Sequence, residues 1–312
     1  MIKSIYIPRW ICFKFYSFNW SDIYKYFLFD CFKELKDNKN CLSIIIERVQ
    51  INKELEEVKL IVRTTPYDTE QIKNNVFNNF SLGLNNLLKR KSLLVKREKK
   101  QKIKTQNCLF FDDFHVVSRR GLDKVFYENL LPFSTSIMME SYSEKNFNLN
   151  NAMNKIIPLN LALLYTFEFS NSEMRLYFSH FYSLLEKHFL NKELKAKYFS
   201  NLENTFSTQK NDFDSVINYI IKTLSTKGKF EEQWLNLWVK SCQQAKKQAL
   251  IMPAEYKNIL NPLKSNTICD VDDNEKWSLF LRLTRLIHKQ MGIPYLIELN
   301  FMYSLKESLQ AS

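Results

Sequence analysis

Two adjacent arginines, Arg119 and Arg120, are the side chains in this sequence best suited to holding an anion or a pair of carbonyl oxygens. They follow a run of β-branched and aromatic residues at 110–117 and precede an amphipathic segment, so the pattern predicts a turn between a strand and a short helix. A guanidinium donates in a fixed fork that matches a carboxylate, and Gly121 lets the backbone turn where a β-carbon would clash. The alternative is a surface turn with solvated arginines.

A second group of candidate residues lies on a helix predicted at 276–290. Ser278, Arg282 and Arg285 are separated by four and three residues, so all three can share one helix face. Trp277 belongs to the neighbouring apolar stripe. The alternative is that the two arginines are ordinary surface cations near the C-terminal end of a helix, where the macrodipole favours them. We expect this helix to meet the arginine turn.

Several common kinds of active site are absent from the sequence. It has no P-loop, GxGxxG, HExxH or GxSxG motif, and its four glycines leave little room for a loop that cradles phosphate. The six cysteines form no CxxC pair and have no histidine at ligand spacing, which favours buried free thiols over a zinc site or a disulfide framework. We therefore expect no metal and no cofactor.

The positive charge is concentrated in one segment. The chain carries a formal charge of +12, and residues 89–104 contain nine basic residues and one acid, Glu98. Such a cluster attracts polyanions, and the residues expected to bind an acidic peptide are Lys96, Arg97, Lys99 and Lys100. A solvated surface excursion is the alternative. Nucleic acid is not expected as a partner, because no recognition helix or aromatic stacking platform accompanies the cluster.

The order of the segments predicts an α+β fold, with an N-terminal antiparallel β-sheet packed with a larger helical C-terminal part. A strand is predicted at 9–18, and the β-rich runs at 41–51 and 58–64 are expected to form an antiparallel hairpin. We expect a sheet-containing part at 1–141, with the basic segment as an insertion, and a helical part at 142–312. Together they are expected to form one compact unit.

Helical patterns dominate the second part of the chain. Ser172 is expected to cap one helix and Asp212 to begin another, and the last helix is predicted from Tyr295 to about Leu309. No signal peptide and no apolar run of about 18 residues is recognisable, so we expect a cytoplasmic protein without membrane contact. A homodimer stays open.

Five segments of the chain occur in an order that one protein family shares. Trp10–Tyr16 resembles the family's opening strand, WLYLKLY, and Leu60–Arg63 resembles its HLRLR strand. Ser118–Gly121 matches part of an ERYGG turn, Met139–Ser141 a hydrophobic-Asp-Ser step, and Phe280–Leu286 the frame of HMHLNRLLG. The family is the thiopeptide-type bacteriocin biosynthesis domain, which is related to the glutamate-elimination domain of class I lanthipeptide dehydratases. The resemblance spans nearly the whole chain and rests on order and spacing.

Two departures decide which branch of the family the chain resembles most. Phe280 and Arg282 stand where the HMHLNR motif has histidines, and Ser118 stands where an acid precedes the RYGG arginine. In the eliminases those residues perform the acid–base chemistry that removes glutamate from glutamylated serine or threonine, so an eliminase built on this chain would lack them. Thiopeptide pyridine synthases keep the scaffold without these residues, and the sequence is most similar to them.

The resemblance implies a cofactor-independent macrocyclase. Such an enzyme joins two dehydroalanines of a thiazole-bearing precursor peptide in a formal aza-[4+2] cycloaddition, and loss of water and of the leader peptide gives the central pyridine. Its partner would be a modified precursor peptide with an acidic leader. The open alternatives are a glutamate-elimination enzyme and a non-catalytic peptide- or nucleic-acid-binding protein.

For that reaction we expect a site built from the arginine turn, the helix at 276–290 and the N-terminal sheet. The expected catalytic residues, which orient carbonyls or transfer protons, are Arg119, Ser278 and Arg285. The expected substrate-binding residues are Arg63, Arg120, Glu140, Ser141, Trp277 and Arg282.

Overall fold

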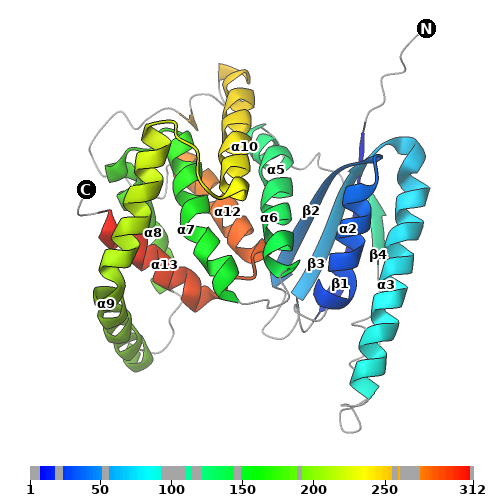
Figure 1. The fold of residues 1–312 in the computed structure, drawn as a ribbon, viewed down its shortest axis with the longest axis horizontal. Helices are drawn as coiled ribbons and strands as arrows, with labels where there is room; N and C mark the ends of the chain where they lie inside the picture. Colours follow the sequence, from blue (N-terminus) through cyan, green and yellow to red (C-terminus); the bar gives the residue numbers. More distant parts are fainter. Residues whose placement is uncertain are drawn as a thin grey trace. The chain divides into compact units, whose positions relative to one another are not determined.

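The computed structural model of the chain describes residues 8–17, 24–50, 56–92, 110–113, 121–143, 149–187, 192–254, 259–260 and 275–309. The chain divides into two compact units. The first comprises Met1–Arg120 and Thr135–Lys145, and the second comprises Gly121–Ser134 and Asn146–Ser312. The first unit contains the sheet and the second is helical, so the predicted α+β fold is confirmed (Figure 1). The division of the chain at residue 141 into a sheet-containing and a helical part stays a prediction.

The first unit is built on a four-stranded antiparallel sheet, as far as the described strands go. The strands lie in the order β2-β3-β1-β4 and are β1 (Arg9–Ser17), β2 (Cys41–Gln50), β3 (Glu56–Thr64) and β4 (Phe110–Asp113). They are rich in β-branched and aromatic residues, which pack well on a pleated surface. The predicted hairpin is confirmed, because β2 pairs antiparallel with β3, with Cys41 opposite Thr64 at one end.

One face of this sheet carries the core of the first unit. The helical segments packed on it are η1 (Tyr24–Leu28, a π-helical turn), α2 (Phe29–Asp37) and α3 (Thr69–Ser92). Ile11, Phe13 and Phe15 alternate along β1 and are completely buried. Phe13 meets Phe77 of α3 edge-on with ring centroids 6.1 Å apart, and Phe15 meets Phe27 of η1 at 5.3 Å. These edge-to-face contacts hold the helices on the sheet.

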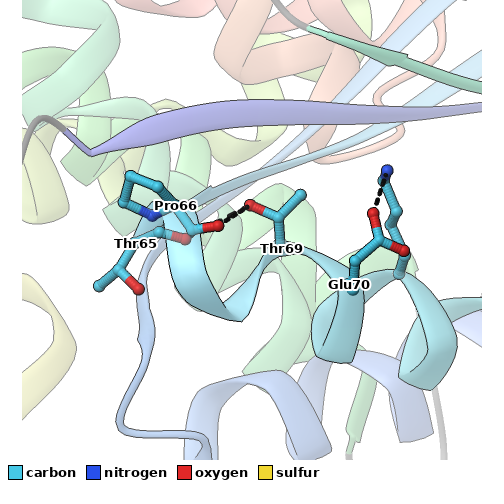
Figure 2. A network of polar contacts seen from close by, with 5 residues as sticks. Thr65, Pro66, Thr69 and Glu70 are labelled. Atoms are coloured by element: carbon cyan, nitrogen blue, oxygen red, sulfur yellow. Dashed lines mark hydrogen bonds and ion pairs between the residues drawn. The ribbon is translucent and has the colours of Figure 1, made fainter.

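The entry to α3 is held by local polar contacts, which Figure 2 shows. A single 3-10 turn, η2 (Pro66–Asp68), links β3 to the helix. The Thr69 hydroxyl donates to the Pro66 carbonyl at 3.2 Å, and Lys73 forms an ion pair with Glu70 at 2.7 Å. Proline presets the backbone for a first helical turn, so the chain changes from strand to helix over a few residues.

The helix α6 (Leu131–Ser143) protects one edge of the sheet. Its residues from Thr135 onward belong to the first unit. The backbone N–H of Ile46, on the edge strand β2, donates to the Thr135 hydroxyl at 3.1 Å, and the Tyr24 hydroxyl donates to the Met139 carbonyl at 3.0 Å. Unpaired edge N–H groups invite pairing with another chain, so this contact occupies one such donor.

The second unit is a group of helices around an aromatic core. The described helices that lie entirely in it are α5 (Gly121–Asn129), α7 (Leu149–Thr166), α8 (Asn171–Glu186), α9 (Lys192–Ser225), α10 (Gln233–Leu250), α12 (Glu275–Gln290) and α13 (Tyr295–Ser308). Phe126, Phe167 and Phe280 are in mutual contact, with ring centroids 5.0–5.5 Å apart. Phe169 contacts Phe280 at 5.1 Å and Tyr177 at 6.0 Å. No described helix combines the length and hydropathy of a membrane span.

Two predicted helix starts are wrong. Ser170, not Ser172, caps α8: its hydroxyl accepts from the Glu173 N–H, and the Glu173 carboxylate accepts from the Ser170 N–H at 2.8 Å. Asp212 lies inside α9, which runs unbroken from Lys192 to Ser225. Serine and aspartate are common caps, but the same residues are tolerated within a helix when tertiary packing continues past them.

Candidate active site

The polar candidates on α12 lie along one exposed face of the helix. Arg282 and Arg285 are exposed and Ser278 is half-buried. The stripe continues with exposed residues one turn further at each end, Glu275 and Lys289. Two guanidiniums and a hydroxyl therefore lie on this face, and groups of this kind donate hydrogen bonds to carbonyl or carboxylate oxygens.

The start of α5 lies beside this face. Arg282 donates to both carboxylate oxygens of Asp123 at 3.3 Å, and Asp123 is in the first turn of α5. The two side chains are 59% and 43% exposed, so water screens the pair and its contribution to stability is small. Gly121, which begins α5, has φ of 57°, a left-handed conformation that glycine adopts without a steric penalty. Gly121 therefore adopts a conformation that favours glycine, in agreement with the role in a turn that the sequence predicted for this residue.

Trp277 lies in the core of the second unit rather than on the exposed face of α12. Only 3% of this residue is exposed, and its ring meets Tyr177 at 6.2 Å and His180 at 6.1 Å between centroids. Its role in the structure is to pack α12 against α8.

The candidates of the first unit differ in what their polar groups do. Arg63, on β3, places its guanidinium 5.7 Å from the centroid of the Trp10 ring. Glu140 is exposed and lies 3.7 Å from the Lys36 ammonium. Ser141 is buried, and its hydroxyl donates to a carbonyl of its own helix at 2.7 Å. The Ser141 hydroxyl is thus engaged within its own helix, whereas Arg63 has donors to offer.

Several candidates lie outside the described residues. They are Arg119, Arg120, Lys96, Arg97, Lys99 and Lys100. Of the basic segment at 89–104, the structure describes only its beginning, where α3 continues to Ser92. Arg63 belongs to the first unit and the α12 residues to the second. Convergence of these groups in one site stays a prediction.

The buried face of α12 carries polar residues that sequence reasoning missed. Thr284 bonds to the Tyr177 hydroxyl at 2.9 Å. One turn later, His288 Nδ1 lies 2.7 Å from a Glu298 carboxylate oxygen and Nε2 lies 3.0 Å from the Asn160 amide nitrogen. Both ring nitrogens are engaged, so this histidine holds α7, α12 and α13 together and has no free nitrogen for a substrate.

Lys276 is the buried polar residue of α12 whose charged group finds no hydrogen-bonding partner among the described residues. The residue is only 2% exposed, and its Nζ lies 4.1 Å from the centroid of the Phe169 ring. Burial lowers the pKa of this ammonium, while the nearby Glu173 and Glu168 carboxylates oppose the shift. Its place on the apolar stripe, four residues before Phe280, is the sequence signal that could have identified it.

Thiolate and metal chemistry receive no support from the described residues. Burial raises the pKa of the Cys31 and Cys242 thiols well above the ordinary value and raises that of Cys41 to about 11. These three thiols are therefore protonated at neutral pH and are weak nucleophiles. No cluster of three or more His, Cys, Asp or Glu side chains in the described ranges could hold a metal ion.

Comparison with known proteins identifies the fold. No protein-family model and no curated protein matches the chain. Among solved structures, TbtD, a pyridine synthase from thiomuracin biosynthesis, is similar with a TM-score of 0.64 at 11% identity, over 97% of this chain and all of TbtD. TsrL is similar with a TM-score of 0.60 at 10% identity, over 98% of this chain and 95% of TsrL. The chain therefore has a fold like that of a thiopeptide pyridine synthase, which confirms the resemblance noted in the motifs.

Proposed function

We propose that this protein is a macrocyclase of thiopeptide biosynthesis, which forms a central pyridine from two dehydroalanines of a modified precursor peptide. The observation that supports this proposal is the end-to-end fold similarity to a pyridine synthase, together with five family-like segments in the family's order. Neither the shared fold nor the motifs alone identifies a reaction. Their agreement over the same stretch of chain makes this reaction the best-supported one.

The reaction itself requires little from the protein beyond confinement and a few donors. Holding two alkenes in register supplies on the order of 7–11 kcal/mol through entropy that the reaction no longer loses. Cycloaddition followed by loss of water and of the leader is redox-neutral, so no electron acceptor is needed. Arginines and hydroxyls can stabilise the negative charge that develops on carbonyl oxygens. The exposed face of α12, with Ser278 and Arg285, offers such groups, and Arg119 is the third proposed catalytic residue.

Glutamate elimination fits the structure less well. Phe280, at one position where the family motif has histidine, is completely buried in the aromatic core. Arg282, at the other position, is paired with Asp123 on the surface. Neither side chain can act as a general acid or base at neutral pH, because phenylalanine does not ionise and arginine keeps its proton. His288, two turns after Phe280 on the same helix, is engaged at both nitrogens.

The natural setting of this function is the cytoplasm, where a ribosomally made precursor is modified. The substrate would carry an acidic leader, and the leader would be recruited by the basic cluster at 89–104. Attraction between opposite charges accelerates the encounter of the two molecules, and salt weakens this attraction. Residues 89–92 of this cluster belong to α3, and the proposed leader-binding residues begin four positions after the end of that helix in the sequence.

The test is mass spectrometry after incubation with a thiazole-containing peptide that carries both dehydroalanines and its leader. The expected products are a pyridine macrocycle and the leader released as a C-terminal amide. A matched substrate with one dehydroalanine replaced by alanine should give neither product. A peptide that loses only glutamate from a glutamylated substrate, with no macrocycle, would instead identify an eliminase. Binding without any product would support a non-catalytic peptide-binding protein.

A further inference from the structure

Three side chains from neighbouring strands form one row across the sheet of the first unit. Trp10 of β1 lies directly opposite Arg63 of β3, and Arg63 lies directly opposite Ser43 of β2. Directly opposed residues point to the same face of a sheet. Trp10 is three positions before Phe13, so the row lies on the face opposite the one that carries Phe13 and the helices η1 and α3.

Two polar atoms of this row are buried and lack a hydrogen-bond partner. They are Arg63 Nε and the Ser43 hydroxyl oxygen, and neither finds a partner within the described parts of the chain. The two residues are themselves half-buried, so they remain partly open to a ligand. A buried polar atom without a partner has lost its hydration and gained no hydrogen bond in return, which is unfavourable. Two such atoms side by side are explained if a ligand supplies the missing acceptor.

The row is pre-organised for an anion. The guanidinium carbon of Arg63 lies over the Trp10 ring, 5.7 Å from its centroid, and this cation–π contact favours one position of the arginine side chain. Asp68, five residues after Arg63 in the chain, accepts from the Asn40 amide at 2.8 Å.

Arg63 itself has no carboxylate within ion-pair distance among the described residues. Among the residues that the structure describes, this row therefore presents an arginine beside an aromatic ring and a serine hydroxyl with no carboxylate paired to them. The edge of a guanidinium formed by Nε–H and one Nη–H matches the two oxygens of a carboxylate in a bidentate pair. The Ser43 hydroxyl can add a third donor from the neighbouring strand.

We propose that Arg63 and Ser43, with Trp10 as the side wall, form a binding site for a carboxylate group, and that in the working enzyme this carboxylate belongs to an acidic residue of the precursor peptide. The carboxylate site itself is inferred only from the geometry of the sheet. The identification of its ligand as the precursor peptide rests on the proposed function. Arg63 thereby binds one acidic side chain of the substrate directly, and the basic cluster at 89–104 acts as a separate, long-range attraction.

The site is tested by NMR of the arginine side chains in the full-length protein. The Arg63 Nε–H signal is assigned as the one lost in Arg63→Lys. N-acetyl-glutamate α-amide should shift this signal and saturate at millimolar concentration, and the neutral glutamine analogue should not. Ser43→Ala should weaken the binding of N-acetyl-glutamate α-amide about tenfold. The control is Arg48→Lys, which makes the same arginine-to-lysine change outside the row, and this variant should bind the compound as the parent does. Equal shifts with both analogues, or a shift with inorganic phosphate alone, would overturn the proposal.

A kinetic experiment separates this inference from the proposed function. If the parent protein forms the macrocycle, the fold increase in KM caused by Arg63→Lys should be about ten times the fold decrease in kcat. The reason is that the substrate loses a binding contact while the reacting groups stay in place. An unchanged KM would overturn the assignment to the precursor peptide. If the parent protein forms no macrocycle, the proposed function fails, and the NMR titration still decides whether the row binds a carboxylate.

Discussion

At the scale of single residues, two buried polar side chains of α12 differ in whether their polar groups are hydrogen-bonded. His288 is engaged at both nitrogens by Glu298 and Asn160, and its ring stacks on Phe181 with the planes 9° apart. Lys276 has a buried ammonium over an aromatic ring and no hydrogen-bonding partner in the described chain. The first arrangement stabilises the fold and the second opposes it, because a buried charge without hydrogen bonds loses its hydration.

Replacing Lys276 with methionine should raise stability at neutral pH. Burial lowers the pKa of this lysine in the folded state, so the folded chain releases the proton at a lower pH than the unfolded chain does. The penalty on folding is therefore present at pH 7 and fades as pH rises towards 10. We expect the free energy of unfolding of Lys276→Met to exceed that of the parent by about 1–3 kcal/mol at pH 7, and by less at pH 9.5.

Urea denaturation at both pH values measures this difference. Lys155→Met is the matched control, because its ammonium also lies over a ring, that of Trp234 at 5.4 Å, but the residue is less buried. A Lys276→Met variant less stable than the parent would show that the ammonium has a partner and stabilises the fold.

Removal of His288 should destabilise the second unit strongly. In His288→Phe the Glu298 carboxylate and the Asn160 amide lose a buried partner, and we expect a loss of about 3 kcal/mol in the free energy of unfolding. The double variant His288→Phe with Glu298→Leu removes the unpaired carboxylate and should recover part of that loss. Urea denaturation of the single and the double variant measures both differences in the free energy of unfolding. A loss below about 1 kcal/mol in His288→Phe would show that the contact is weak.

At the scale of elements, the start of α8 depends on one serine. Ser170 and Glu173 satisfy each other's backbone N–H groups. Ser170→Ala should therefore lower the free energy of unfolding by about 1 kcal/mol. Ser172→Ala is the matched control two residues away, and we expect a change within about 0.5 kcal/mol because Ser172 does not cap the helix. If Ser172→Ala lost more than Ser170→Ala, the cap would lie where the sequence pattern placed it.

The exposed face of α12 is the element on which the proposed catalysis depends. Arg285→Ala and Arg119→Ala should each lower kcat on the order of 10²–10³-fold if these guanidiniums stabilise charge in the transition state. Arg285 is exposed, so its removal should leave the melting temperature unchanged. Arg175→Ala, an exposed arginine on α8, is the control and should keep parental kcat. Near-parental turnover in both folded variants would remove these residues from the site.

At the scale of the whole molecule, charge is distributed unevenly along the chain. The basic cluster at 89–104 carries much of the net charge of +12. Glutamine in place of Lys96, Arg97, Lys99 and Lys100 should raise KM for the full-length precursor and spare kcat, and the parent should show a KM that rises with salt. The control variant replaces four exposed lysines elsewhere, Lys210, Lys222, Lys227 and Lys229. Equal effects in the two variants would indicate net charge rather than a leader-binding segment.

Sequence alone determined the features whose cause is local. Runs of β-branched and aromatic residues predicted β1 and the β2–β3 hairpin, and the spacing of Ser278, Arg282 and Arg285 implied a shared helix face. The order of degenerate motifs was enough to identify the fold, because order and spacing survive when individual residues change. It did not identify which of two nearby serines, Ser170 or Ser172, caps α8, since both are suitable residues.

Only the tertiary structure decided which polar groups meet. His288 bonds to Glu298, ten residues away, and to Asn160, 128 residues away. Ser43 lies beside Arg63 because β2 pairs with β3 in one register, and a shift of one residue would turn Ser43 to the other face. Contacts of this kind depend on packing between elements distant in the chain, and no local spacing encodes them. For the same reason Trp277 and Lys276, adjacent to the exposed Glu275, are buried: Trp277 packs against Tyr177 of α8, and Lys276 lies over Phe169, just before α8.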